Sequence, residues 1–364
     1  MTNVLFVCTV PTDKSGIPNV IFNLLDRIDT TRYNIGYVAI NEPTEYYKEK
    51  LRKINSKLFV ISRKIYNPFG YIKNLTNVAK DYDIIHVHGN SATMVLEMIA
   101  AKLAGVKVRI AHSHNTTCNM KTIDAVARPL FYTLCNGRLA CGNEAGYWLF
   151  RNKKFTIINN GIDVEKFRFN KDSRDSIRAN IGVTDECVIG HIGNFVEQKN
   201  HSFLIDIFKK YSEIQPTSKL LLLGDGPLRC SIQSKVQNLG LEDKVIFAGS
   251  VDHPEEYVNA MDLVVMPSLF EGLPLTLVEE QANGLSIVAA DTITPDANMT
   301  GNIRFFPLSH AAYIWANHIQ KLLTESSHNE ESSNAAITII KKANYDVDSA
   351  ARTLELYYYD KLKS

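Results

Sequence analysis

Short β-rich runs alternate with amphipathic helical patterns along the chain, and no other feature limits the possible folds as much. In the first half we expect strands at Val4–Val10, Ile35–Ile40, Leu58–Ile61, Ile84–His88, Val106–His112, Arg138–Cys141 and Phe155–Asn159. The gaps carry helical spacing, and in 18–28 the apolar residues Val20, Ile21, Leu24, Leu25 and Ile28 form one stripe. Strands that alternate with helices predict a parallel sheet covered on both faces.

The pattern starts again in the second half. The expected strands there are Val188–Ile192, Leu220–Leu223, Val245–Ala248, Leu263–Met266 and Ile287–Ala290. A chain of 364 residues also exceeds what one hydrophobic core usually supports. We therefore predict an α/β protein with two doubly wound, Rossmann-like domains, 1–163 and 164–346, joined near the turn-rich stretch 159–167. The last amphipathic segment, 347–364, suits packing back on the first domain or on the second.

Composition and flanking residues favour a cytoplasmic protein. No stretch approaches the roughly 20 unbroken apolar residues that span a bilayer. The apolar run Val4–Val10 has no basic segment before it and no small-residue cleavage site after it, so we expect a strand there and not a signal peptide. The six cysteines form no C-x-x-C pair, which suits reduced packing thiols better than disulfides or a zinc site.

The net charge of +1 hides an asymmetry between the two halves. Residues 1–163 hold 21 Lys and Arg against 12 Asp and Glu, a net of +9, and the rest hold 19 against 27, a net of −8. Much of the positive charge lies in 48–64, "KEKLRKINSKLFVISRK", which is either a solvated helix face or a patch for the anionic inner face of the cell membrane. We expect no nucleic-acid partner, because no binding motif and no interleaved exposed aromatics accompany the patch.

Ligands of doubly wound sheets bind beyond the carboxyl ends of the strands, where loops lead into helices. The first such loop, "PTDKSGIPNV", places Gly16 and Pro18 at a helix start, where backbone can approach an anion. It is neither a G-x-G-x-x-G motif nor a P-loop, which argues against a dehydrogenase or an NTPase. A lone glycine before a helix is also a common structural feature.

The second loop, "GHIGNFVEQKNHSF", places Lys199 between a strand and the next helix, with Asn200 as the expected N-cap. A charge-assisted bond from Lys199 to a phosphate would contribute roughly 1.5 to 3 kcal/mol, several times the value of a surface ion pair. Taken alone, the loop equally fits a solvated lysine at a helix start.

The third loop lies in "SLFEGLPLTLVEEQANG", where Pro274 is expected to open a helix and Gly284 to close it. The amides of Leu275, Thr276 and Leu277 are then helix-start donors without intrahelical partners. Such amides, together with the helix dipole, favour a phosphate.

Two glutamates bracket that helix start. Glu279, in the second turn, can accept two hydrogen bonds from a vicinal diol such as a ribose, and Glu271, beside flexible Gly272, can reach the other end of the ligand. Eight residues of helix would separate them by roughly 12 Å, more than the roughly 5 to 9.5 Å between the paired carboxylates of glycosidases. The spacing therefore fits a nucleotide diphosphate held at its sugar and ribose ends.

The segment "EGLPLTLVE", Glu271–Glu279, resembles the E-x7-E signature of the retaining glycosyltransferases of family 4. The likeness extends over nearly the whole chain, through "SGIPNV", "DIIHVH", "RIAHSHN", "NNGIDVEKF", "EQKNH", "LLLGDGPLR" and "VIFAGSV" in that order. The resemblance implies the GT-B architecture, two Rossmann-like domains facing each other across a cleft. Within the family, the sequence is similar to the branch that builds bacterial surface polysaccharides such as capsule and exopolysaccharide.

The resemblance also implies roles for donor-binding residues. Lys199 would hold the donor diphosphate, with support from the amides of Gly16, Leu275 and Thr276. Glu279 would bind the ribose, and backbone at Val251 would contact the base. The transferred sugar would be bound by Glu271, Gly272 and Leu273.

Three histidines complete the expected site. His112 resembles the family's active-site histidine near the reacting sugar, so the expected catalytic residues are His112, Glu271 and Lys199. His114 and His88 are expected on the acceptor side, with His86 in the core. By its position alone, His112 also fits a packed histidine at a strand end.

Two positions depart from the family pattern. An arginine usually precedes the lysine in a "GR" step, but here the step is Gly193-Asn194, and Ser15-Gly16 stands where two glycines are common. Asn194 can donate a hydrogen bond to the diphosphate but carries no charge. Loss of the charged partner would cost roughly 1.5 to 3 kcal/mol of phosphate stabilisation unless another base, Lys14 or Arg229, replaces it.

These observations predict a retaining glycosyltransferase that moves a sugar from a nucleoside diphosphate donor, UDP-linked, to a glycan or lipid-linked saccharide acceptor in polysaccharide biosynthesis. We expect no cofactor and no metal, because no D-x-D pair stands at a strand end with a clear position in the cleft, and Lys199 with helix-start amides would neutralise the leaving group. Two alternatives stay open: a nucleotide-sugar epimerase of the same architecture, and a non-catalytic nucleotide-sugar-binding protein impaired at Asn194.

Overall fold

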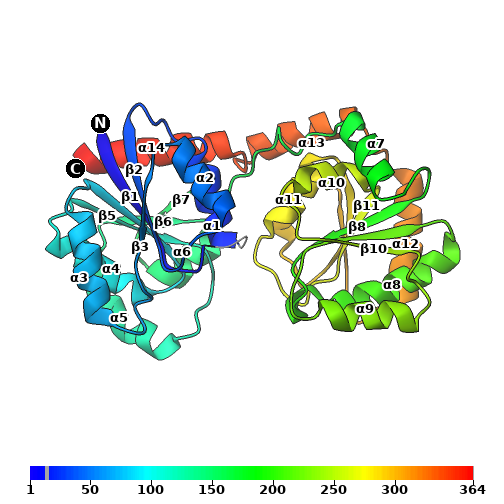
Figure 1. The fold of residues 1–364 in the computed structure, drawn as a ribbon, viewed down its shortest axis with the longest axis horizontal. Helices are drawn as coiled ribbons and strands as arrows, with labels where there is room; N and C mark the ends of the chain where they lie inside the picture. Colours follow the sequence, from blue (N-terminus) through cyan, green and yellow to red (C-terminus); the bar gives the residue numbers. More distant parts are fainter. Residues whose placement is uncertain (13–15, 364) are drawn as a thin grey trace. The chain divides into compact units, whose positions relative to one another are not determined.

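The computed structural model describes residues 1–12 and 16–363, which divide into two units. The N-terminal unit comprises Met1–Ile162 and Asn344–Ser364, and the C-terminal unit comprises Asp163–Ala343. Each unit is a parallel sheet with helices on its faces (Figure 1). Within the described residues, no helix is both long enough and apolar enough to cross a bilayer.

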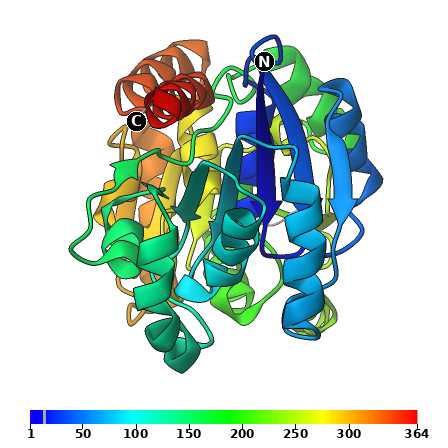
Figure 2. The same ribbon diagram turned by 90° about the vertical axis from the view of Figure 1, so that its left-hand side faces the viewer.

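The N-terminal sheet has seven strands in the order β3-β2-β1-β4-β5-β6-β7. Its strands are β1 (Thr2–Cys8), β2 (Tyr33–Ala39), β3 (Lys57–Val60), β4 (Ile84–Gly89), β5 (Val108–Ser113), β6 (Gly137–Ala140) and β7 (Thr156–Ile157). The helices are α1 (Gly16–Leu25), α2 (Glu45–Lys53), α3 (Pro68–Ala79), the 3-10 turn η1 (Ala92–Met94), α4 (Val95–Leu103), α5 (Lys121–Leu134), α6 (Asn143–Phe150) and α14 (Val347–Lys363). Figure 2 shows helices on both sides of this sheet.

The C-terminal sheet has six strands in the order β10-β9-β8-β11-β12-β13. Its strands are β8 (Val188–Ile192), β9 (Lys219–Leu223), β10 (Val245–Gly249), β11 (Leu263–Met266), β12 (Ser286–Ala290) and β13 (Ile303–Phe306). The helices are α7 (Lys171–Asn180), the turn η2 (Glu197–Lys199), α8 (His201–Ile214), α9 (Arg229–Asn238), α10 (Pro254–Ala260), α11 (Leu275–Ala282), the turn η3 (Pro295–Ala297), α12 (Ala312–Glu325) and α13 (Glu330–Lys342).

Both sheets follow the doubly wound order, in which the chain starts in the middle and turns back once. The order reverses between β1 and β4 in one unit and between β8 and β11 in the other. Every strand expected from the sequence is present, and β13 is an additional strand. Its four residues include Arg304 and are too short and too polar to stand out as a strand in the sequence.

The chain returns to the N-terminal unit through α14, the last helix (red in Figure 1). Leu354 and Tyr358 are buried, and the Tyr357 hydroxyl accepts a 2.8 Å hydrogen bond from the amide of Arg138 in β6. Leu362, in the last turn of the helix, is exposed, so the apolar face of the segment does not extend to its end. The helix therefore packs on the first sheet, a choice that the sequence left open.

Candidate functional site

An ion pair marks the switch point of the C-terminal sheet. The loop after β8 runs into η2 and Lys199, and the loop after β11 carries Glu271. Lys199 Nζ lies 2.7 Å from Glu271 Oε1, and the two side chains are 16% and 8% exposed. Because ligands of doubly wound sheets bind where the strand order reverses, this pair lies where a ligand is expected.

Gln198 fixes the carboxylate of that pair. Its Nε2 donates to Glu271 Oε2 and to the carbonyl of Phe270, each at 3.0 Å, while the Leu269 amide donates to the Gln198 carbonyl at 2.8 Å. The sequence did not single out Gln198, because nothing apart from its position next to Lys199 marks it as part of a site. The result is a pair of loops held together by side chain and backbone.

Asn200 also joins the two loops. The expectation that its side chain caps the next helix is wrong. It precedes α8 with a left-handed φ of 53°, and its side chain makes no capping bond. Its Nδ2 instead donates to the Pro267 carbonyl at 3.1 Å. The side chain therefore holds the β11 loop and not the helix start.

The loop between β8 and η2 is tightly packed on one side and open on the other. A Cβ on Gly224, whose φ is 131°, would stand 2.2 Å from the Gly193 carbonyl oxygen, so two loops meet there backbone to backbone. Asn194 is exposed. Arg229, at the start of α9, pairs with Asp225 at 3.3 Å near the end of β9, and Lys14 and Ser15 lie outside the described residues.

Helix α11 begins at Leu275 after Pro274, and Gly284 with φ 87° follows its end, as the sequence predicted. Of the three amides expected to lack an intrahelical partner, that of Leu277 has one, because it donates to the Pro274 carbonyl at 3.1 Å. The amides of Leu275 and Thr276 stand in the first turn, where the helix itself provides no acceptor. Two helix-start donors therefore remain for an anion.

Strand β8, the loop after β11 and the first turn of α11 each carry a buried polar atom without a partner in the described residues. Thr276 Oγ1, Ser268 Oγ and His191 Nε2 are buried without a hydrogen-bond partner among the residues that the structure describes. The Nδ1 of His191 donates to the Val265 carbonyl at 2.8 Å, so the neutral ring leaves Nε2 as a bare acceptor. Buried polar atoms without partners are rare and costly in proteins, which is typical of a place built for a polar ligand.

The second turn of α11 carries two carboxyls of raised pKa. Burial raises the pKa of Glu279 to about 7, with Glu255 adding to the effect and Lys166 opposing it. Glu280 is completely buried, and neither of its oxygens has a partner within residues 1–12 and 16–363. Burial and the neighbouring Glu279 raise the pKa of Glu280 well above its usual range. Sequence reasoning did not single out Glu280.

The other predicted donor residues follow the carboxyl ends of strands, on loops or, for Gly16, at a helix start. Gly272 is exposed and precedes the half-buried Leu273, and Val251 follows β10. Gly16 is the first residue of α1, two positions before the expected helix start, and a Cβ there would meet nothing within 4 Å. The roles of these residues remain predictions.

Four histidines form a cluster in the N-terminal unit. His86 and His88 lie on β4, His112 on β5 and His114 directly after it, with ring centroids of neighbouring rings 4.1 to 5.3 Å apart. His88, expected on the acceptor side, is completely buried like His86 and His112, and only His114 is half-buried. Burial lowers the pKa of His114 to about 4 and those of the other three well below their usual range.

Spacing alone makes part of this cluster a candidate metal site. His86, His88 and His112 each offer a ring nitrogen, and the three nitrogens lie within 4.8 Å of one another. Both nitrogens of His86, however, already make hydrogen bonds, one to the Tyr358 hydroxyl at 2.7 Å and one to His112 Nδ1 at 3.2 Å. The metal-free reaction stays a prediction.

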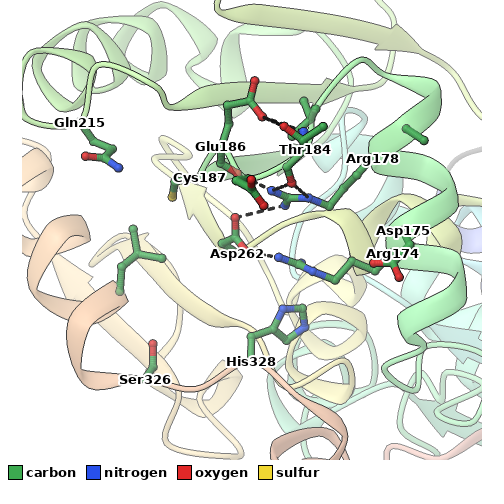
Figure 3. Close-up of a pocket in the computed structure, with 14 residues that line it drawn as sticks. Arg174, Asp175, Arg178, Thr184, Glu186, Cys187, Gln215, Asp262, Ser326 and His328 are labelled. Atoms are coloured by element: carbon green, nitrogen blue, oxygen red, sulfur yellow. Dashed lines mark hydrogen bonds and ion pairs between the residues drawn. The ribbon is translucent and has the colours of Figure 1, made fainter.

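A cavity of about 720 Å³ lies elsewhere, near the amino ends of β8 and β11 (Figure 3). Arg174 and Arg178 of α7 extend to Asp262, which precedes β11, and Arg178 also donates to the carbonyls of Thr184 and Ala260. These contacts attach α7 to the sheet. The arginines are thus already paired, and the cavity is on the wrong edge of the sheet for a switch-point ligand.

Comparisons with known proteins agree with this architecture. The family model described as "Glycosyl transferases group 1" matches residues 173–339, and "Glycosyltransferase Family 4" matches residues 14–166. The putative glycosyltransferase EpsF of Bacillus subtilis (strain 168) is 32% identical over 327 residues, 85% of each chain. The UDP-Gal:alpha-D-GlcNAc-diphosphoundecaprenol alpha-1,3-galactosyltransferase of Escherichia coli is 29% identical over 225 residues, 58% of each chain.

Solved structures share the fold. Anabaena HepE in complex with UDP superimposes with a TM-score of 0.78 at 18% identity, covering 99% of this chain and 100% of that one. Sucrose-phosphate synthase from Thermosynechococcus elongatus gives a TM-score of 0.76 at 16% identity, covering 99% of each chain. Both sheets have the same winding order, two family models together span most of the sequence, and one relative is matched over 85% of its length. The chain therefore belongs to the family 4 glycosyltransferases and has the GT-B fold.

Proposed function

We propose that this glycosyltransferase transfers a sugar from a UDP-sugar to a glycan or lipid-linked saccharide acceptor in polysaccharide biosynthesis, with retention at the anomeric carbon. The name of the Escherichia coli relative, which specifies UDP-Gal and a diphosphoundecaprenol acceptor, supports this class of substrates. So do the HepE structures with UDP and with UDP-glucose.

The observation that carries the proposal is the Lys199–Glu271 ion pair beside the start of α11. In this arrangement Lys199 moves from the carboxylate to the donor diphosphate, and the amides of Leu275 and Thr276 donate to the same phosphate groups. Gly16 is proposed to add a further amide. Glu271, held by Gln198, is then available to accept hydrogen bonds from hydroxyls of the transferred sugar.

The reaction then needs no residue that attacks the sugar. The bond between the anomeric carbon and the diphosphate breaks, and the acceptor oxygen forms the new bond on the same face of the sugar. The acceptor proton passes to the departing phosphate oxygen. Lys199 and the amides stabilise the negative charge that develops on the leaving diphosphate, which is the electrostatic stabilisation that enzymes commonly use.

The remaining residues orient the substrates. Glu279 would accept hydrogen bonds from the ribose hydroxyls as a carboxylate, backbone at Val251 would contact the base, and Asn194 would donate to the diphosphate. In the N-terminal unit, His112 would lie near the reacting sugar and His114, half-buried, toward the acceptor, with His88 acting through His114 by their 2.8 Å hydrogen bond.

We further propose a cytoplasmic protein that binds anionic membrane at segment 48–64. Four cations of this segment are ion-paired: Lys48 with Glu42, Lys50 with Asp26, Arg52 with Glu45 and Lys64 with Glu97. Lys53, Lys57 and Arg63 are exposed and have no ion pair in the described part of the chain. Exposed Tyr66 and Phe69 follow the segment. Cations beside exposed aromatics suit a lipid surface.

Donor binding and turnover test the proposal separately. Thermal shift with UDP, GDP, ADP and their sugars identifies the base, because a ligand at 100 times its dissociation constant stabilises by about 2.7 kcal/mol. We expect UDP and a UDP-sugar to stabilise the protein, and NMR of the product formed with a lipid-linked saccharide to show the anomeric configuration of the donor. An inverted product contradicts the mechanism, an epimer formed from donor alone indicates an epimerase, and tight UDP binding without release of UDP indicates a binding protein.

A further inference from the structure

A chain of hydrogen bonds joins the last helix to the histidine cluster of the N-terminal unit. The Tyr358 hydroxyl lies 2.7 Å from His86 Nδ1, and His86 Nε2 lies 3.2 Å from His112 Nδ1. All three side chains are completely buried. Phe6 of β1 packs against His86, with ring centroids 5.1 Å apart, and helps to hold its orientation. These contacts fix the orientation of the rings, but not which nitrogen of each ring carries the proton.

The two imidazoles are arranged as a hydrogen-bonded pair and not as ligands of one metal ion. Their planes differ by 5°, and their centroids are 5.3 Å apart, whereas the two nitrogens are 3.2 Å apart. The difference of 2.1 Å is close to twice the distance from a ring centroid to its own nitrogen, as expected when both nitrogens lie near the line between the centroids. The nitrogens therefore point at each other. A shared ion at the roughly 2.0 Å of a Zn–N bond would have to lie to one side of the line between the nitrogens, away from the direction in which they point.

The direction of the bonds follows from counting donors. Each neutral imidazole carries one proton. If Tyr358 donates to His86 Nδ1, then His86 Nε2–H donates to His112 Nδ1 and the chain ends in His112 Nε2–H. If the direction is reversed, the Tyr358 hydroxyl needs another acceptor, and His86 Nδ1 is the only hydrogen-bond partner it has among the described residues.

The two directions leave different numbers of buried atoms unpaired. His112 Nε2 is buried without a partner in the described residues in either case. The reverse direction also leaves the Tyr358 O–H unpaired, and a buried donor without an acceptor is costly. The forward direction, from Tyr358 toward His112, is therefore favoured. Burial, which lowers the pKa of both histidines, keeps the rings neutral and agrees with this count.

We propose that Tyr358 is a positioning residue, whose hydroxyl acts through His86 to hold His112 in the tautomer that carries its proton on Nε2. Its consequence for catalysis rests on the proposed function, in which His112 lies near the reacting sugar. There the Nε2–H is a hydrogen-bond donor for a sugar or phosphate oxygen of the donor substrate. A bare Nε2 in the other tautomer could only accept, and would face that oxygen lone pair to lone pair.

Nitrogen NMR of histidine-labelled protein tests the tautomer directly and needs no substrate. The ring signals of His86 and His112 are assigned with His86→Phe and His112→Asn. In the wild type we expect both rings to carry the proton on Nε2. In Tyr358→Phe, which removes only the hydroxyl, we expect His112 Nε2 to shift toward the unprotonated range. A wild-type His112 with bare Nε2, signals unchanged in Tyr358→Phe, or zinc that binds and shifts both rings would each overturn the proposal.

Kinetics test the consequence. Removing a transition-state hydrogen-bond donor outright costs roughly 10²- to 10³-fold in kcat, so we expect Tyr358→Phe to lower kcat by about tenfold or more with the KM for donor unchanged. Tyr357→Phe is the matched control: it removes a neighbouring hydroxyl of α14 that binds the Arg138 amide and no histidine. A merely structural hydroxyl predicts equal losses of stability and activity in both variants.

The double variant separates coupling from packing. If Tyr358 acts through His86, Tyr358→Phe in the His86→Phe background lowers kcat no further, whereas independent contributions would multiply. Multiplied losses would overturn the proposal. Failure of the proposed function is visible elsewhere, in the absence of UDP binding and sugar transfer by the wild type, while the NMR result still decides the tautomer.

Discussion

Lys199 and Glu271 neutralise each other across two loops of the C-terminal sheet, with 2.7 Å between ammonium and carboxylate. Gln198 holds the second carboxylate oxygen at 3.0 Å, so Glu271 keeps a partner when the lysine leaves. The arrangement keeps a largely buried cation paired, and in the proposed function a donor diphosphate would replace the carboxylate.

Replacing Lys199 should therefore affect stability and catalysis in different ways. Lys199→Met is expected to lower kcat/KM for the donor by roughly 10²- to 10³-fold and to destabilise the fold by about 1 to 3 kcal/mol, because Glu271 loses its cation in a mostly buried position. Steady-state kinetics and urea unfolding measure the two effects.

The double variant Lys199→Met/Glu271→Gln tells these effects apart. It should recover most of the stability, since no unpaired charge remains, but none of the activity. Lys210→Met is the control, because its pair with Glu213 is about half exposed and should contribute little. Full activity in Lys199→Met would contradict the role of this residue.

Asn194→Arg should strengthen donor binding. The new guanidinium would stand on the exposed loop after β8 and add a charge-assisted bond of roughly 1.5 to 3 kcal/mol to the diphosphate, which lowers the Kd for UDP about tenfold or more. Isothermal titration calorimetry measures the change. Asn238→Arg, at the exposed end of α9, adds the same charge away from the loop and should leave the Kd unchanged. An equal Kd in both variants would place the diphosphate away from Asn194.

Glu279→Gln should stabilise the protein at alkaline pH while weakening donor binding. The pKa of Glu279 is raised from 4.5 to about 7 in the folded state, so between these values the folded protein holds a proton that the unfolded chain has released. Stability therefore falls as the pH rises through this window. We expect Glu279→Gln to be more stable than the wild type by about 3 kcal/mol at pH 8 and similar to it at pH 4.

Ligand binding provides the second readout for Glu279. The variant should bind UDP more weakly but bind an analogue without the ribose 2′ and 3′ hydroxyls as the wild type does. Glu256→Gln, an exposed change on α10, should alter neither stability nor binding. Equal affinity of wild type and Glu279→Gln for UDP would exclude a ribose contact.

Membrane binding should depend on the cations of segment 48–64 that lack ion pairs among the described residues, and two of these three, Lys53 and Lys57, can be replaced together. Lys53→Ser/Lys57→Ser is expected to weaken binding to vesicles containing phosphatidylglycerol by about 2 kcal/mol, roughly 30-fold. Lys50→Ser/Arg52→Ser, which removes two paired cations, should have a smaller effect. Co-sedimentation measures both, and equal binding by all three proteins would mean that this segment is not the membrane contact.

The sequence by itself determined the α/β alternation, the two sheets and the loops that carry Lys199, Glu271 and Glu279. It could do so because strand runs, helix stripes and the turn residues Pro274 and Gly284 act locally, within a few neighbours along the chain. Strand β13 was missed, since four residues that include a charge carry little local signal.

Only the tertiary structure decided which side chains meet. The Lys199–Glu271 pair, its support by Gln198, the burial of Glu280 and the return of α14 to place Tyr358 on His86 all join residues that are distant in sequence or depend on what packs around them. No local pattern encodes such contacts, because burial and pairing depend on how the sheets and helices fold together. The proton on His112 belongs to this second group, since its position depends on a hydroxyl that the last helix delivers.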